Sequence, residues 1–151
     1  FLDEITLIAY CLMPNHFHFF IKQKNSNSID RFIQSLATRY TMYFNRKYKR
    51  VGSLFQGVYK AVIVTREEQF IYLTKYIHRQ ALALQGETLQ GQPSSYPQYL
   101  GLRNTSWVHP EEVLSNFSET NQKLSYKSFV EEQDGNTSAI LKETIIENCE
   151  D

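Results

Sequence analysis

Two imidazoles lie two residues apart, directly after a turn signal, in the stretch Met13-Pro14-Asn15-His16-Phe17-His18-Phe19-Phe20. Residues 5–12 are apolar and β-prone, and residues 16–22 follow as a second predicted strand, so the two segments indicate a hairpin. Alternation along a strand places His16 and His18 on one face, and Phe17 and Phe19 on the other, where they can be buried. Two imidazoles on one face are a possible metal-binding pair, although two half-buried histidines are the simpler interpretation.

The segments that follow the hairpin predict helices, one further strand and a linker. Apolar residues recur at helical spacing over residues 29–48, and residues 58–64 are rich in β-branched side chains, which favour a strand. Thr65 and Glu68 have the spacing of a capping box, with Thr65 as N-cap of a helix that extends to about residue 84. Gly, Gln, Pro and Ser dominate residues 85–95, and three acidic helices are predicted near residues 110–117, 124–132 and 138–147.

Charge is distributed unevenly along the chain. Residues 1–80 hold 12 Lys and Arg against 5 Asp and Glu, a balance of +7, while the remainder holds 4 against 11, a balance of −7. The basic part is therefore a candidate for binding a polyanion. We expect a domain over residues 1–84, a linker and packing segment over 85–105, and an acidic helical extension over 106–151.

Composition also excludes some classes of protein. The chain contains no run of 18 or more apolar residues, so we expect no membrane span. The two cysteines, Cys11 and Cys149, do not make a disulfide framework, and a reduced, cytoplasmic setting is expected.

A second cluster of candidate groups lies on the helix that begins after Thr65. Tyr72, Tyr76 and Gln80 are four residues apart and therefore share one face. A metal held by His16, His18 and the Gln80 oxygen would activate a phosphodiester while Tyr76 attacks it. Ligands of this kind suit Mg²⁺ or Mn²⁺ better than structural zinc. Tyr72 is a rival nucleophile on the same face.

Three strings carry a resemblance to a known family: Ala9-Tyr10-Cys11-Leu12-Met13-Pro14-Asn15-His16-Phe17-His18, Leu54-Phe55-Gln56-Gly57-Val58-Tyr59-Lys60-Ala61 and Tyr76-Ile77-His78. Over residues 6–118 the chain resembles the single-tyrosine HUH transposases of the insertion-sequence 200/605 type, and especially the REP-associated tyrosine transposases. The resemblance implies a prokaryotic, nucleoid-associated enzyme.

The resemblance assigns a role to each matching residue. It implies that His16, His18 and Gln80 bind Mg²⁺ or Mn²⁺, and that Tyr76 cuts single-stranded DNA and becomes joined to the 5′ phosphate. The implied substrate is a DNA hairpin with a single-stranded cleavage site at its foot. The basic residues that we expect to contact this DNA are Arg39, Arg46, Lys49, Arg50 and Lys60.

The resemblance further implies an α+β fold, a ferredoxin-like (RRM-like) antiparallel sheet with helices on one face. The chain begins a few residues before what would be the second strand, so we expect the first strand and helix of that fold to be missing from it. Relatives of the REP-associated type usually read Tyr-Ile-His-x-Asn-Pro, whereas this chain has Gln80 and Ala81 at the last two positions. His78 shares this motif but points away from Gln80, so we expect it to be structural or DNA-facing.

Two alternatives and one question stay open. The chain is an active transposase or, because of the expected missing segment, a catalytically inactive or domesticated relative that grips DNA hairpins. A hydrolase using metal-bound water is disfavoured because no carboxylate lies near the two histidines in sequence. Monomeric and homodimeric states are both compatible with the resemblance.

Overall fold

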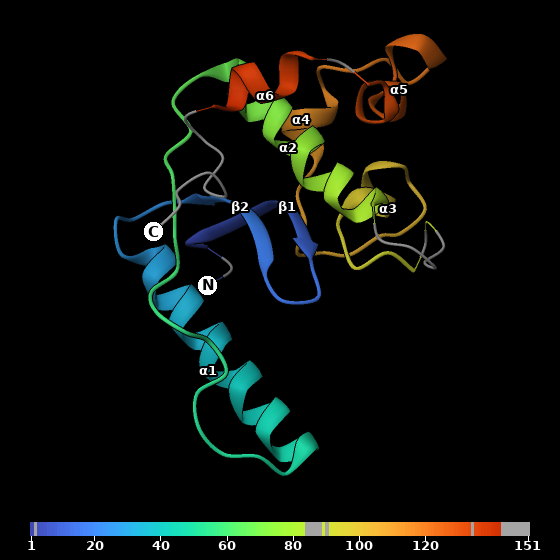
Figure 1. Ribbon diagram of the computed structural model, residues 1–151. Helices are drawn as coiled ribbons and strands as arrows, with labels where there is room; N and C mark the ends of the chain where they lie inside the picture. Colours follow the sequence, from blue (N-terminus) through green and yellow to red (C-terminus); the bar gives the residue numbers. More distant parts are fainter. Residues whose placement is uncertain (2, 84–88, 90, 134, 143–151) are drawn as a thin grey trace. The chain divides into compact units, whose positions relative to one another are not determined.

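The computed structural model describes residues 1, 3–83, 89, 91–133 and 135–142, and these form an α+β structure (Figure 1). They divide into two compact units. Unit 1 comprises Phe1–Ile5 and Gln23–Ala61, and unit 2 comprises Thr6–Lys22 and the described residues from Val62 onward. These units differ from the segments expected from composition, and the expected domain division stays a prediction.

The predicted hairpin is confirmed. Strand β1 is Ile5–Leu12 and strand β2 is Phe17–Gln23, and they form a two-stranded sheet. The Met13 amide donates to the His16 carbonyl at 2.9 Å and closes the turn. The rings of Phe17 and Phe19 lie 4.7 Å apart, yet both side chains are only half-buried. The fully buried aromatic residue of β2 is Phe20, which packs against Phe70 at 5.1 Å.

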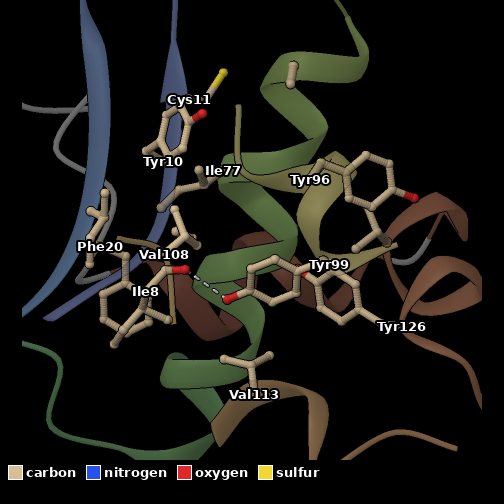
Figure 2. Packing of buried hydrophobic residues seen from close by; sticks show 14 residues of the cluster. Ile8, Tyr10, Cys11, Phe20, Ile77, Tyr96, Tyr99, Val108, Val113 and Tyr126 are labelled. Atoms are coloured by element: carbon tan, nitrogen blue, oxygen red, sulfur yellow. Dashed lines mark hydrogen bonds between the residues drawn. The ribbon is translucent and has the colours of Figure 1, made fainter. Parts of the chain in front are cut away.

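Strand β1 is the centre of the core. All of its residues from Leu7 to Cys11 are buried, on both faces of the strand. The edge that does not face β2 is hydrogen-bonded to downstream chain: Ser95 donates to the Tyr10 carbonyl at 3.0 Å, and His109 to the Leu7 carbonyl at 2.9 Å. The Tyr99 hydroxyl also donates to the Ile8 carbonyl at 3.0 Å (Figure 2). Residues of β1, α2 and the chain beyond residue 91 therefore share one hydrophobic core.

Helix α2, Glu67–Leu82, begins one residue later than the capping-box spacing predicts. Its N-cap is Arg66, and the side-chain oxygen of Gln69 accepts hydrogen bonds from the amides of Thr65 at 3.4 Å and Arg66 at 3.3 Å. Gln69, at the third helical position, therefore takes the part expected of Glu68. Ile77 and Ala81 lie on the buried face of α2.

His78 ties α2 to two other parts of unit 2. Its side chain is fully buried, with Nδ1 2.6 Å from the Tyr126 hydroxyl and Nε2 2.7 Å from Ser95 Oγ. The Tyr126 hydroxyl donates its proton to Thr74 Oγ1 at 2.9 Å, so it accepts from the Nδ1–H of His78. The Nε2 lone pair then accepts from Ser95. His78 is thus structural, and its burial rules out the DNA-facing alternative.

The C-terminal part of unit 2 contains short elements. They are α3 (Tyr96–Tyr99), α4 (Glu111–Leu114), the 3-10 helix η1 (Gln122–Leu124), α5 (Tyr126–Glu131) and α6 (Asn136–Leu141). Helices α5 and α6 pack on α2. Helices α4 and α5 are shorter than the acidic helices predicted over residues 110–117 and 124–132, and α6 begins two residues before the one predicted over residues 138–147. The predictions for residues 84–88, 90 and 143–151, which include Cys149, concern positions outside the described residues.

Unit 1 consists mainly of helix α1, Ser28–Tyr48, and the segment that follows it. The N-terminal end of α1 is held by Glu4, which accepts from Ser28 Oγ at 3.2 Å and pairs with Arg31 at 3.3 Å. Residues 50–61 then run back alongside α1 (Figure 1), as contacts of Asn45 with Gly52 and of Asp30 with Tyr59 show.

The strand predicted over residues 58–64 is wrong, because these residues have no regular secondary structure and pair with neither strand of the described sheet. Val58 and Ile63 are almost fully exposed. β-Branched residues favour a strand only where a hydrogen-bonding edge and an apolar face are available to them. The described residues thus contain one two-stranded antiparallel sheet, and the ferredoxin-like arrangement stays a prediction. None of the described helices combines the length and apolarity that a membrane span requires.

The buried position of His78 predicts a specific pH dependence of stability. Burial lowers the pKa of His78 to about 3 from an ordinary value of 6.5. Below about pH 6.5 the unfolded chain binds a proton at this imidazole that the folded protein does not bind, so the free energy of unfolding falls as the pH falls. The loss from this group is at most about 1.4 kcal/mol per pH unit between about pH 6.5 and 3.

Urea denaturation of wild type and His78→Gln at several pH values measures this contribution. The difference between the two free energies of unfolding should shrink as the pH falls below about 6.5, because only the wild type loses stability through His78. The other titrating groups are common to both proteins and cancel in the difference. Parallel pH profiles for the two proteins would show that His78 is protonated equally in both states.

Candidate active site

The two histidines of the hairpin lie side by side. Their rings are 4.9 Å apart and nearly perpendicular, and His16 Nε2 is 3.1 Å from His18 Nε2. His16 is exposed and His18 half-buried, so the pair is accessible from solvent. The two side chains therefore share one face, as predicted, and the Nε2 atoms of the two rings face each other.

Asn15 orients the first of these imidazoles. Its Oδ1 lies 2.7 Å from His16 Nδ1, and because an amide oxygen only accepts, His16 donates through Nδ1–H. In the neutral ring the lone pair is then on Nε2, the atom that faces His18. In the sequence, Asn15 is evident only as a turn signal, and this contact with His16 is not predicted. The residue type at position 15 was the available clue, since histidine ligands are commonly oriented by a hydrogen bond to the other ring nitrogen.

Helix α2 brings Tyr76 to the imidazole pair. The Tyr76 ring lies 5.7 Å from the His18 ring at an interplanar angle of 80°, and Tyr76 is half-buried against the core. Packing of Phe20 on Phe70 joins the same strand and helix nearby. Strand β2 and helix α2, which are far apart in the sequence, thus place the Tyr76 phenol beside the His18 imidazole.

Tyr72, the rival nucleophile, has a different environment. Its ring packs edge-on against Phe129 of α5 at 5.2 Å. The helix register had put Tyr72 and Tyr76 on one face, and only the packing around α2 separates them. Gln80 lies one turn beyond Tyr76 and is half-buried. The structure brings His18 into contact with both His16 and Tyr76, and helix register places Gln80 one turn from Tyr76.

The imidazole pair is compatible with the expected metal. Two ligands at right angles on an ion, each about 2.1 Å away, are about 3.0 Å apart. The observed separation of 3.1 Å is close to that value. Among the described residues no group of three or more His, Cys, Asp or Glu side chains could hold a metal ion. The expected ligand set contains only two residues of those types, so its third ligand would be the Gln80 amide oxygen.

The expected DNA-contacting residues all lie in unit 1 and are exposed. Arg46, Lys49 and Arg50 gather around the C-terminal end of α1, where Lys49 is the C-cap. Arg39 lies two turns earlier on α1, and Lys60 lies on the returning segment. Lys47 was not selected from the sequence, yet its ammonium lies over the rings of two neighbouring tyrosines.

Fold and site together define an α+β protein in which two imidazoles lie at the start of a strand and one of them contacts a tyrosine on a helix. Comparison with protein families adds the identity: the model described as "Transposase IS200 like" matches residues 3–80, just over half of the chain, and the chain belongs to this family. His16, His18, Tyr76 and Gln80 all lie within the matched segment. Comparisons with curated proteins and with solved structures give no match. Membership implies a role in transposition and a DNA substrate.

The contact between Asn15 and His16 predicts the tautomers of the imidazole pair. In chelator-treated protein, ¹⁵N NMR should show neutral His16 protonated at Nδ1 and His18 protonated at Nε2, because the facing Nε2 atoms need one donor and one acceptor. Asn15→Leu should shift His16 towards the Nε2-protonated form while His109 is unchanged. A wild-type His16 protonated at Nε2 would contradict this assignment.

Proposed function

We propose that this protein is a metal-dependent endonuclease and transposase that cuts and rejoins single-stranded DNA at hairpin ends through a 5′-phosphotyrosine intermediate. The observation that carries the proposal is the contact of the Tyr76 ring with His18, whose Nε2 faces that of His16. A phenol and two imidazoles are the groups that a tyrosine-based phosphoryl transfer uses. Family membership supports a DNA substrate.

The proposed reaction exchanges one phosphodiester for another. The Tyr76 hydroxyl oxygen forms a bond to the scissile phosphorus, while the bond from that phosphorus to the 3′ oxygen of the preceding nucleotide breaks. The phenolic proton passes to solvent, and the departing 3′ oxygen takes up a proton. The products are a 5′-phosphotyrosine and a free 3′ hydroxyl. The new phosphodiester retains the energy of the old one, so rejoining needs no ATP.

His16, His18 and Gln80 would hold the Mg²⁺ or Mn²⁺ ion that such a site requires. When bound, the ion supplies Lewis-acid stabilisation of the charge that develops on the phosphate. The protein contributes the position of its groups: Asn15 keeps the His16 Nε2 lone pair available, and the packing of α2 keeps Tyr76 beside His18. The exposed basic residues Arg39, Arg46, Lys49, Arg50 and Lys60 would contact DNA phosphates.

A covalent adduct tests the nucleophile. The protein is mixed with hairpin oligonucleotides labelled at the 5′ or 3′ end and with Mn²⁺ or Mg²⁺, and is then run on a denaturing gel. Because the 5′ phosphate becomes joined to the protein, the 3′ label should migrate with the protein and the 5′ label with a shortened free strand. Tyr76→Phe should abolish the adduct, whereas Tyr72→Phe, a matched loss of one hydroxyl, should retain it.

Other results assign the site differently. An adduct that survives Tyr76→Phe but not Tyr72→Phe would move the nucleophile to Tyr72. Tight hairpin binding by well-folded protein with no adduct would support the inactive hairpin-binding alternative.

Metal affinity tests the ligand set independently of cleavage. Isothermal titration with Mn²⁺ should show one site in the wild type, weakened at least tenfold by His18→Ala, because a ligand is lost. Gln80→Ala should weaken it in the same direction. His109→Ala is the matched control, since His109 is exposed and pairs with Glu111 at 3.9 Å. Equal Mn²⁺ affinities of the wild type and His18→Ala would show that His18 is not a metal ligand.

A further inference from the structure

Helix α1 exposes an unusual amount of aromatic surface. Ser28 is its only buried residue, and Tyr40, Tyr43 and Tyr48 are 47%, 58% and 56% exposed. The tyrosines at positions 96, 99 and 126 in unit 2 are buried instead. Large aromatic side chains contribute most to stability when they are buried, so a helix that displays several of them indicates a binding surface.

Together with the half-buried Phe44, the exposed rings form a connected series. The distance between ring centroids is 6.4 Å from Tyr40 to Tyr43, 6.2 Å from Tyr40 to Phe44 and 4.4 Å from Phe44 to Tyr48. Phe55, on the returning segment, extends the series at 6.2 Å from Tyr40. We refer to Tyr40, Tyr43, Phe44, Tyr48 and Phe55 as the α1 aromatic cluster.

Cations lie over these rings. The Lys47 ammonium is 5.8 Å from the centroid of Tyr43 and 5.3 Å from that of Tyr48, and the Arg50 guanidinium is 5.9 Å from that of Phe44. Residues 31–66 contain eight Lys and Arg and no Asp or Glu. The α1 aromatic cluster is therefore embedded in a surface of one sign of charge, which selects an anionic ligand.

We infer that the α1 aromatic cluster binds unpaired nucleotides of single-stranded DNA, with the rings stacking on bases and Lys47 and Arg50 contacting phosphates. This ligand combines the two properties that the surface matches, flat π faces and a regular row of negative charges. Paired DNA offers only the charges, because its bases are stacked within the duplex. This inference rests on the proposed function, which makes single-stranded DNA the substrate. It adds that α1 binds the unpaired part of that DNA.

Equilibrium binding without divalent metal tests this inference, because no cleavage is then expected. Fluorescence anisotropy with a labelled oligodeoxythymidine should show binding weakened about 5- to 150-fold by Tyr43→Leu or Tyr48→Leu, the loss of one stacked base. Binding of a duplex of equal length should change little. Leucine keeps the helix propensity of α1, and circular dichroism confirms the fold.

Salt dependence separates stacking from charge. Lys47→Gln should lower the slope of log affinity against log salt by about 0.7, whereas Tyr43→Leu should leave the slope unchanged. Met42→Ala is the matched control, since Met42 is 67% exposed on the same helix but lies outside the α1 aromatic cluster. It should bind the oligonucleotide as the wild type does.

Two results would overturn the inference. Equal losses for single-stranded and duplex DNA would assign the surface to stem phosphates. Unchanged DNA binding, with an oligomeric state altered by both Tyr43→Leu and Met42→Ala in light scattering, would make it a protein interface. The proposed function can fail separately. If the wild type forms no Tyr76 adduct, while Tyr43→Leu binds single-stranded DNA more weakly than the wild type does, cleavage is refuted and this inference is supported.

Discussion

One buried imidazole organises the larger unit. His78 donates to the Tyr126 hydroxyl and accepts from Ser95, and Ser95 Oγ in turn accepts from the Tyr10 amide of β1 at 2.9 Å. A single side chain thus joins α2 to the central strand and to α5. Tyr76 lies two residues earlier on the same helix, so the network that fixes His78 also fixes the phenol relative to the hairpin. An unpaired polar group at this depth would be costly, which makes the arrangement specific.

The two units use aromatic residues in opposite ways. In unit 2, Tyr96, Tyr99 and Tyr126 surround His78 and are buried, with each hydroxyl hydrogen-bonded. In unit 1, most of the α1 aromatic cluster lies on a helix whose only buried residue is Ser28. Burial of the first group contributes to stability, whereas the second group leaves apolar area in water. The same residue type therefore serves packing in one unit and, as proposed, recognition in the other.

Local sequence predicted the parts of the site that depend on local geometry. The alternation of a strand was enough to pair His16 with His18, and helix periodicity was enough to separate His78 from the face of Tyr76. Failures came where long-range partners decide. Residues 58–64 have the composition of a strand but pair with neither strand of the described sheet, and the capping box shifted by one residue because the Gln69 side chain, not that of Glu68, accepts from the amides at the start of α2.

By itself the sequence determined the hairpin, the two long helices, the basic first part of the chain and the family to which it belongs. Each of these depends on spacing within one segment or on a motif. Only the tertiary structure gave Tyr72 and Tyr76 different surroundings, because the two share a helix face and differ in what packs on them: Phe129 for Tyr72 and His18 for Tyr76. It also gave Asn15 its role, since a turn residue becomes an orienting group only when the imidazole beside it is held in place. Periodicity shows which face of an element a side chain occupies, and packing decides what that face meets.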